Sequence, residues 1–269
     1  MFTIHPLTTG TVRIKQAMGR GVGTGLRRRS GLFRPGAMTG ALPIHAWAIE
    51  HDEGLILVDA GESAAARDQP FARFEVTREQ ELDRALEGAG FAPGDVTTVV
   101  LTHIHTDHVG GLPHVPHARV LAGAHELRFT NSAGARVTRR VLRQPLPPGF
   151  AAQPLELDGS ALGAFGASAP ITADGRIAAV PTPGHTPGHL AVIVDQGDHH
   201  VLLGGDSAYD QAQLLELHVD GVSPREDVAR ATMETILEHA RRHPTVYLPT
   251  HDPGSAARLA ATEALPAPA

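Results

Sequence analysis

The segment THIHTDHVGG, residues 102–111, places three histidines and one aspartate within six consecutive positions. His103 and His105 follow the apolar run VVL two residues apart, so in an extended chain their side chains point to the same side and can bind one ion. Asp107 and His108 come next, in a turn made tight by glycines. Four ligands from six residues cannot all reach one tetrahedral centre without strain, so the segment predicts two neighbouring metal ions.

Further candidate ligands follow other apolar runs. Five such runs predict buried strands that lead into functional loops, at residues 54–61, 96–105, 176–185, 200–206 and 245–252. His185, Asp206 and His251 lie at the ends of three of them, each beside Gly or Pro. A carboxylate such as Asp206 can bridge two ions about 3.5 to 4 Å apart. The chain has no cysteine, so nitrogen and oxygen must supply every ligand.

Helical patterns lie between the predicted strands. Thr77 and Gln80 predict a capping box that opens a helix. Ser223 as N-cap and Pro224 at the first helical position predict a second, longer helix. The alternation of strands and helices indicates a layered α/β fold. We expect residues 1–269 to form a single domain.

Three segments lack a regular pattern. Residues 18–40 are rich in Gly and Arg, and residues 131–169 are rich in Pro, Gly and Ala, so both are predicted to be irregular. We expect residues 264–269 to form a frayed tail.

The net charge and the N-terminal sequence bear on which binding partners and which cellular compartment we expect. The net charge is −6 and the pI about 6.3, which does not favour a nucleic-acid partner. Arg27, Arg28 and Arg29 form a local basic cluster, which is interpreted as a solvated loop. No basic leader opens the chain, and no apolar run approaches about 18 residues. These features predict a cytoplasmic protein without a membrane partner.

The motif THIHTDHVGG, followed in order by PTPGHTPGH, GGDSAYD and HDP, resembles the metallo-β-lactamase superfamily, and within it the N-acyl homoserine lactonases. The resemblance covers residues 59–252. It implies a four-layer αβ/βα sandwich, in which two facing sheets carry helices on their outer sides and a dinuclear site lies at one edge.

The resemblance also assigns roles to the ligands. It implies that the first metal is held by His103, His105 and His185. It implies that the second is held by Asp107, His108 and His251, with Asp206 between them. Asp59 in LVDAG matches a strand-end aspartate of the family that would orient a ligand imidazole.

Tyr209 distinguishes the subfamily. It lies three residues after Asp206, where the lactonases carry a tyrosine that hydrogen-bonds the substrate carbonyl, and the chain has only two tyrosines. One position departs from the pattern, because Thr106 stands where the lactonases commonly have an aromatic residue.

The predicted reaction is the hydrolysis of a lactone, with an N-acyl homoserine lactone as the first candidate. Two divalent ions would lower the pKa of a shared water, and the resulting hydroxide would attack the carbonyl carbon. Tyr209 would stabilise the developing charge, and Asp107 would carry a proton to the leaving alkoxide. Zn is the expected metal, while Co, Mn and Fe suit the same ligands.

Other functions share such a site. They are arylester or organophosphate hydrolysis, a glyoxalase II-like thioesterase, and a non-catalytic metal-binding module. A homodimer is compatible with the family. We expect Leu32, Phe33 and Met38, in the N-terminal loop, to form an apolar wall for an acyl chain.

Overall fold

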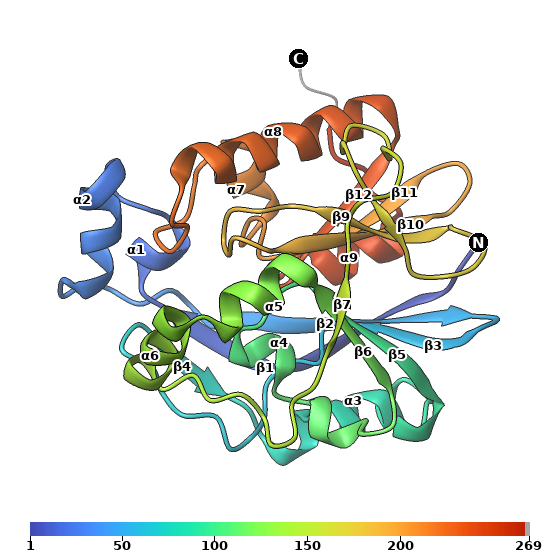
Figure 1. The fold of residues 1–269 in the computed structure, drawn as a ribbon, viewed down its shortest axis with the longest axis horizontal. Coiled ribbons are helices and arrows are strands. Elements are labelled where there is room, and N and C mark those ends of the chain that lie inside the picture. The colour runs from blue at the N-terminus through green and yellow to red at the C-terminus, as the bar shows by residue number, and fades with distance from the viewer. Residues whose placement is uncertain (267–269) are drawn as a thin grey trace. The chain divides into compact units, whose positions relative to one another are not determined.

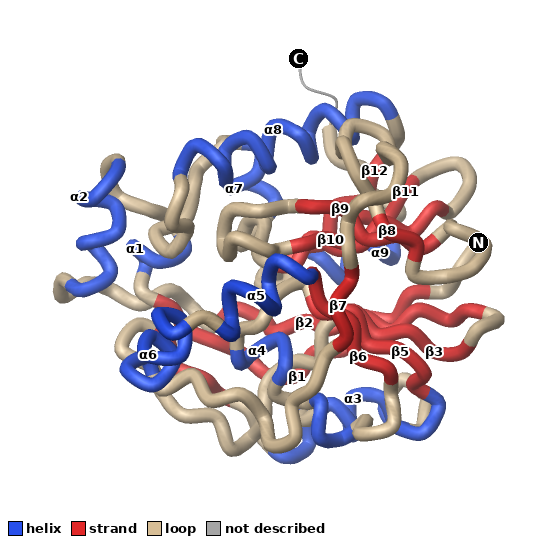
Figure 2. Tube along the Cα trace, in the orientation of Figure 1, coloured by secondary structure: helices blue, strands red, loops and turns tan. Residues whose placement is uncertain are grey.

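The computed structural model describes residues 1–266, without the side chains of Leu26 and Arg29. Its contacts divide the chain into two compact units. The N-terminal unit comprises residues 2–14 and 38–155, and the C-terminal unit comprises residue 1, residues 15–37 and the chain from residue 156 onward. Each unit contains one β-sheet (Figure 1, Figure 2). The expectation of a single domain stays a prediction.

The N-terminal unit is built on a seven-stranded sheet in the order β4-β1-β2-β3-β5-β6-β7. Its strands are β1 (Ile4–Ile14), β2 (Leu42–His51), β3 (Gly54–Val58), β4 (Ala72–Glu75), β5 (Val96–Leu101), β6 (Arg119–Gly123) and β7 (Gln153–Leu155). β3, β5, β6 and β7 are parallel neighbours, and the other pairs are antiparallel. Its α-helices are α3 (Leu82–Gly88), α4 (Thr106–Val109), α5 (Ala124–Asn131) and α6 (Ala133–Leu142), and its short 3-10 helices are η2 (Arg78–Gln80), η3 (Pro93–Asp95) and η4 (Leu112–His114).

The C-terminal unit is built on a five-stranded sheet in the order β12-β11-β10-β9-β8. Its strands are β8 (Ala169–Pro170), β9 (Ile177–Pro181), β10 (Leu190–Asp195), β11 (His200–Gly205) and β12 (Thr245–Pro249). Only β11 and β12 pair in parallel within this sheet. Its helices are α1 (Gln16–Gly19), α2 (Gly25–Ser30), η1 (Gly31–Phe33), α7 (Gln211–Leu215), α8 (Glu226–Arg242) and α9 (Ser255–Ala261).

Each unit has its own apolar core between sheet and helix. In the N-terminal unit, Leu57 and Val99 pack in one cluster with Leu86 of α3. In the C-terminal unit, Ile193 of β10 and Ile236 of α8 belong to another. In Figure 1, α8 runs along the sheet of its own unit. Full burial of one such side chain contributes about 1.5–3 kcal/mol, so these faces hold the strands whose ends carry the candidate ligands.

The predicted strands are confirmed, because β3, β5, β9, β11 and β12 fall within the five apolar runs. The capping box is also confirmed: Thr77 accepts a hydrogen bond from the third residue of η2, and Gln80 accepts one from the Thr77 N–H at 3.0 Å. The start predicted for the long helix is wrong. α8 begins at Glu226, because the Ser223 N–H donates to Asp220 Oδ1 at 2.6 Å and holds this segment in a turn.

The two irregular segments are partly helical. α2 and η1 form within residues 18–40, and α6 forms within residues 131–169. At the C-terminal end, the Leu265 side chain is buried and its N–H donates to the Thr245 carbonyl at 2.8 Å. Residues 267–269 of the predicted tail lie outside the described residues. No helix within residues 1–266 has the length and apolar character needed to span a bilayer.

Candidate metal centre

The first ligand segment follows β5, beside the end of β3. Val58 and Val100 are partners in the parallel pair β3–β5, so the turn at Asp59 lies next to Thr102. Asp59 has a φ of +61°, a costly conformation for a residue with a side chain. Its carboxylate accepts hydrogen bonds from the Thr102 N–H at 2.8 Å and from His108 Nδ1 at 2.8 Å. These bonds hold the His108 ring so that Nε2 is the nitrogen that can coordinate a metal.

The His103 and His105 rings converge. His103 Nε2 lies 2.9 Å from His105 Nδ1. Two ligands on one tetrahedral zinc ion, each about 2.0–2.1 Å from it, lie roughly 3.3 Å apart, so this spacing suits a shared ion after a small adjustment. Glu126 of α5 supports the loop, because it accepts a hydrogen bond from the Ile104 N–H at 3.2 Å.

Asp107 and His108 form the second part of this set. Asp107 Oδ1 lies 3.9 Å from His108 Nε2. Glu62 is buried nearby: burial raises its pKa to about 7, and the negative charge of Asp107 adds to the increase. The Ser63 N–H donates to Glu62 at 2.9 Å and acts in the opposite direction. Glu62 was not predicted from the sequence, since it follows the LVDAG run as an ordinary turn residue.

The second ligand set lies in the C-terminal unit, after three different strands. His185 follows β9, Asp206 follows β11 and His251 follows β12. Asp206 Oδ2 lies 3.5 Å from His185 Nε2, and Asp206 Oδ1 lies 3.4 Å from His251 Nε2. A carboxylate with one oxygen toward each of two imidazoles has the geometry of a bridge between two ions. The donor atoms of this unit therefore suit divalent metals.

His185 is oriented by a carboxylate that sequence analysis missed. Asp220 Oδ2 lies 3.1 Å from His185 Nδ1, while Asp220 Oδ1 accepts from the Ser223 N–H. Arg28 of α2 is also buried, 3.9 Å from Asp220 Oδ1, and donates to the Ser223 carbonyl at 2.5 Å. The interpretation of the arginine cluster as a solvated loop is thus wrong for Arg28. Asp220 lies 35 residues from His185, so no local pattern connects the two.

His189 holds the backbone of one ligand in the second set. The Asp206 N–H donates to His189 Nε2 at 3.0 Å, and His189 Nδ1 lies 2.8 Å from Thr182 Oγ1. His189 therefore fixes the backbone that carries Asp206.

Tyr209 lies within the second ligand set. Its buried ring stacks on the His251 imidazole, with centroids 5.4 Å apart and an interplanar angle of 22°. It meets the His185 ring edge-on at 5.9 Å. Gln213 fixes the backbone, because its Oε1 accepts from the Tyr209 N–H at 2.6 Å. Tyr209 is therefore held by its neighbours beside two of the candidate ligands.

The predicted acyl-chain wall is divided between the units. Leu32 and Phe33 lie in η1 of the C-terminal unit, where Leu32 is buried and Phe33 is 74% exposed. Met38 belongs to the N-terminal unit. The wall therefore stays a prediction.

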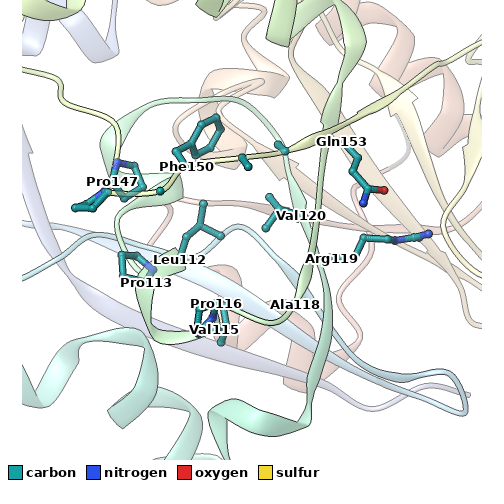
Figure 3. A pocket seen from close by; sticks show the side chains of 14 residues that line it. Leu112, Pro113, Val115, Pro116, Ala118, Arg119, Val120, Pro147, Phe150 and Gln153 are labelled. Atoms are coloured by element: carbon teal, nitrogen blue, oxygen red, sulfur yellow. The ribbon is translucent and has the colours of Figure 1, made fainter.

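The N-terminal unit contains two notable cavities. One, of about 420 Å³, is lined by apolar and proline side chains such as Leu112, Pro147 and Phe150, and by none of the predicted ligands (Figure 3). The other, of about 350 Å³, is lined in part by Glu62 and Thr106. Of these two cavities, only the smaller one borders the ligand-bearing helix α4. The volume of a cavity therefore does not identify the candidate site.

Comparisons with known proteins agree with this chemistry. Residues 39–251 match the metallo-beta-lactamase superfamily. A probable metallo-hydrolase of Mycobacterium tuberculosis is 32% identical over 184 residues, which are 65% of this chain and 59% of that protein. The chain thus spans 59% of this relative's length. The N-acyl homoserine lactonase AttM of Agrobacterium fabrum is 26% identical over 227 residues, 79% of this chain and 82% of that protein.

Solved structures resemble the fold over nearly the whole chain. A mutant of AiiA from B. thuringiensis, with N-decanoyl-L-homoserine at its active site, has a TM-score of 0.71, 19% identity and 94% coverage of both chains. AidC, a dizinc quorum-quenching lactonase in complex with a product, has a TM-score of 0.65 and 19% identity, covering 94% of this chain and 88% of that one. The match over residues 39–251 and these likenesses show that the chain belongs to the metallo-β-lactamase superfamily and has its fold.

Proposed function

We propose that this protein is a metal-dependent hydrolase that opens a lactone ring, with N-acyl homoserine lactones as its first substrate class. The observation that carries the proposal is the Asp206 carboxylate, which turns one oxygen toward His185 and the other toward His251, with Tyr209 stacked beside them. Relatives and structural neighbours described as lactonases of this class support it.

The proposed metal centre takes its ligands as the family resemblance assigns them. His103, His105 and His185 would hold one divalent ion, and Asp107, His108 and His251 a second. Asp206 would contact both. Zinc is our first choice, and Co, Mn or Fe would accept the same ligands. Bound there, the ions would supply Lewis-acid chemistry by activating a water and polarising a carbonyl.

The side chains of this protein would perform the remaining steps. The Tyr209 hydroxyl would donate a hydrogen bond to the substrate carbonyl oxygen, where negative charge develops during attack. Asp107 would orient the attacking water and transfer its proton to the ring oxygen as the ester bond breaks. Asp59 and Asp220 would keep His108 and His185 in their orientations. Water is thus added across the ester bond, and the product is a hydroxy acid.

A substrate panel tests the proposal. It contains short- and long-chain acyl homoserine lactones, simple γ- and δ-lactones, an arylester, a thioester and a phosphotriester. Metal-stripped protein is the control. We expect hydrolysis of acyl homoserine lactones by protein that holds about two metals per chain. A phosphotriester or thioester hydrolysed faster than every lactone would assign the site to that reaction instead. Fewer than two metals without any hydrolysis would indicate a non-catalytic module.

Tyr209→Phe tests the role of the hydroxyl. Loss of one donor to the developing oxyanion typically costs about 10²-fold in kcat. The matched control is Tyr247→Phe, at the only other tyrosine, whose buried hydroxyl lies 2.9 Å from Ser207 Oγ. This control removes a neutral hydrogen bond worth about 1 kcal/mol of stability, and we expect it to retain kcat. Equal kcat values for wild type and Tyr209→Phe would remove Tyr209 from the mechanism.

A further inference from the structure

The stretch from residue 127 to residue 155 has a charge opposite to that of the whole chain. It contains no Asp or Glu, although the chain has a net charge of −6. Its five arginines are Arg128, Arg136, Arg139, Arg140 and Arg143. The helix α6 lies within this basic stretch.

The apolar side of α6 is exposed. Ser132 caps its N-terminus by accepting from the Ala135 N–H at 3.2 Å, and none of its ten residues is buried. Val137 and Val141 are 64% and 67% exposed, and they lie four residues apart, so they form one ridge along the helix. Phe129, near the end of α5, is 40% exposed. α6 thus presents apolar side chains without covering them.

Arginines flank this ridge. Arg136 and Arg140 are exposed, and their spacing along the helix places them on the flank next to Val137 and Val141. Within residues 1–266, Arg136, Arg140 and Arg143 have no carboxylate partner. Arg139 has a different role, since it donates to the Thr130 carbonyl at 2.6 Å and fastens α6 to α5. Apolar and cationic groups therefore lie side by side on one exposed helix.

We propose that α6 docks this protein reversibly on an anionic lipid surface. A bilayer interface accepts apolar side chains at the acyl boundary and arginines at the phosphates, which is the pairing that α6 offers. The negative charge of the rest of the chain would be repelled by the same surface, so binding would orient the protein with α6 toward the lipid. Peripheral docking needs no spanning helix, and it departs from the expectation of no membrane partner, which rested on the N-terminal sequence and on the lengths of the apolar runs.

Two other occupants suit these features less well. A second copy packed symmetrically on α6 would place Arg136 and Arg140 against their own equivalents, where like charges repel. Nucleic acid offers phosphates but little apolar surface for Val137 and Val141. An acidic protein could offer both carboxylates and apolar surface, and the test below distinguishes it from a lipid surface.

The test is sedimentation of the full chain with vesicles of phosphatidylcholine, alone or mixed in equal parts with phosphatidylglycerol. We expect binding to the mixed vesicles only, and its loss at high salt. Arg136→Gln with Arg140→Gln should weaken binding by about 25-fold, since each arginine near an anionic surface contributes roughly fivefold. Val137→Ser with Val141→Ser should also weaken it. Circular dichroism checks that the variants are folded.

The matched control is Arg241→Gln with Arg242→Gln, an exposed pair on α8 that is ion-paired with Glu238. It removes the same charge and should leave binding unchanged. Equal binding to neutral vesicles, or equal losses in both arginine pairs, would overturn the proposal. Binding to polyglutamate without binding to vesicles would replace the lipid with an acidic protein. A dimer seen by light scattering and abolished by the valine substitutions would replace it with a second copy.

Discussion

The two units supply candidate ligands in different ways. In the N-terminal unit, four ligands lie within the six residues from His103 to His108, after one strand. In the C-terminal unit, three ligands between His185 and His251 follow three strands. The first set depends on one loop, whereas the second depends on the register of β9, β11 and β12. Histidine and aspartate ligands are thus brought together in the N-terminal unit by a short segment of sequence, and in the C-terminal unit by the pairing of strands.

The support behind the ligands differs as well. Asp59, which holds His108, lies at the end of the strand next to the ligand loop. Asp220, which holds His185, lies in a turn packed against the buried Arg28 of a distant helix. We therefore expect the second set to respond to substitutions farther from the metal than the first set does.

The largest effect should come from removing a ligand in each set. We expect both His103→Ala and Asp206→Ala to lower kcat/KM on the order of 10³-fold. Metal content, measured by mass spectrometry after dialysis, should separate them. His103→Ala should retain about one ion, while Asp206→Ala should weaken both, because its two oxygens face different histidines. Two tightly held ions in Asp206→Ala would contradict the bridging role.

The next effect concerns the orienting carboxylates. Asp59→Asn and Asp220→Asn each keep the shape of the side chain and remove its charge. We expect each to weaken metal affinity by about 10- to 100-fold, the usual effect of losing the partner of a ligand histidine. Competition with a chromophoric chelator measures this. If metal affinity fell in Asp59→Asn but not in Asp220→Asn, only the ligand set of the N-terminal unit would need its orienting carboxylate.

Arg28→Met tests the remote support of the second set. It removes the guanidinium that packs on Asp220 and bonds the Ser223 carbonyl, and we expect metal affinity to fall by about fivefold, close to 1 kcal/mol. Arg27→Met, an exposed position on the same helix, is the matched control and should have no effect. Equal metal affinities in the two variants would show that Asp220 orients His185 without help from Arg28.

The smallest effect concerns histidines of the C-terminal unit outside the candidate site. His239 lies 2.9 Å from His200 and stacks with it, near His243 and Arg242. Burial, with the charges of His200 and His243, lowers the pKa of His239 to about 4. Below its ordinary value of about 6.5, the unfolded chain therefore binds more protons, and stability falls as the pH falls toward 4.

We expect metal-free protein to lose about 1 kcal/mol of unfolding free energy from this group between pH 6.5 and 5, measured by urea denaturation. His239→Gln should reduce the pH dependence, and His117→Gln, at an exposed position, should not. The same pH dependence in both variants would assign it to other groups, such as the candidate ligands.

Several features could be predicted because they are local. The apolar runs predicted β3, β5, β9, β11 and β12, since burial requires a continuous apolar sequence. The helix α6 is not predicted in this way, because the Pro, Gly and Ala content of residues 131–169 favours irregular structure, and the helix leaves its apolar ridge unburied. The sequence predicts a start of α8 that is too early, because the turn held by Asp220 occupies the residues that resemble a cap.

The superfamily and the candidate ligands could be recognised from the amino-acid sequence, because the histidines and aspartates directly follow apolar strands. The residues that support these ligands become apparent in the folded chain. Asp220 reaches His185 across 35 residues, and Arg28 reaches the Asp220 segment across 192. A hydrogen bond depends on distance in space, and the chain must fold before residues so far apart in sequence become neighbours.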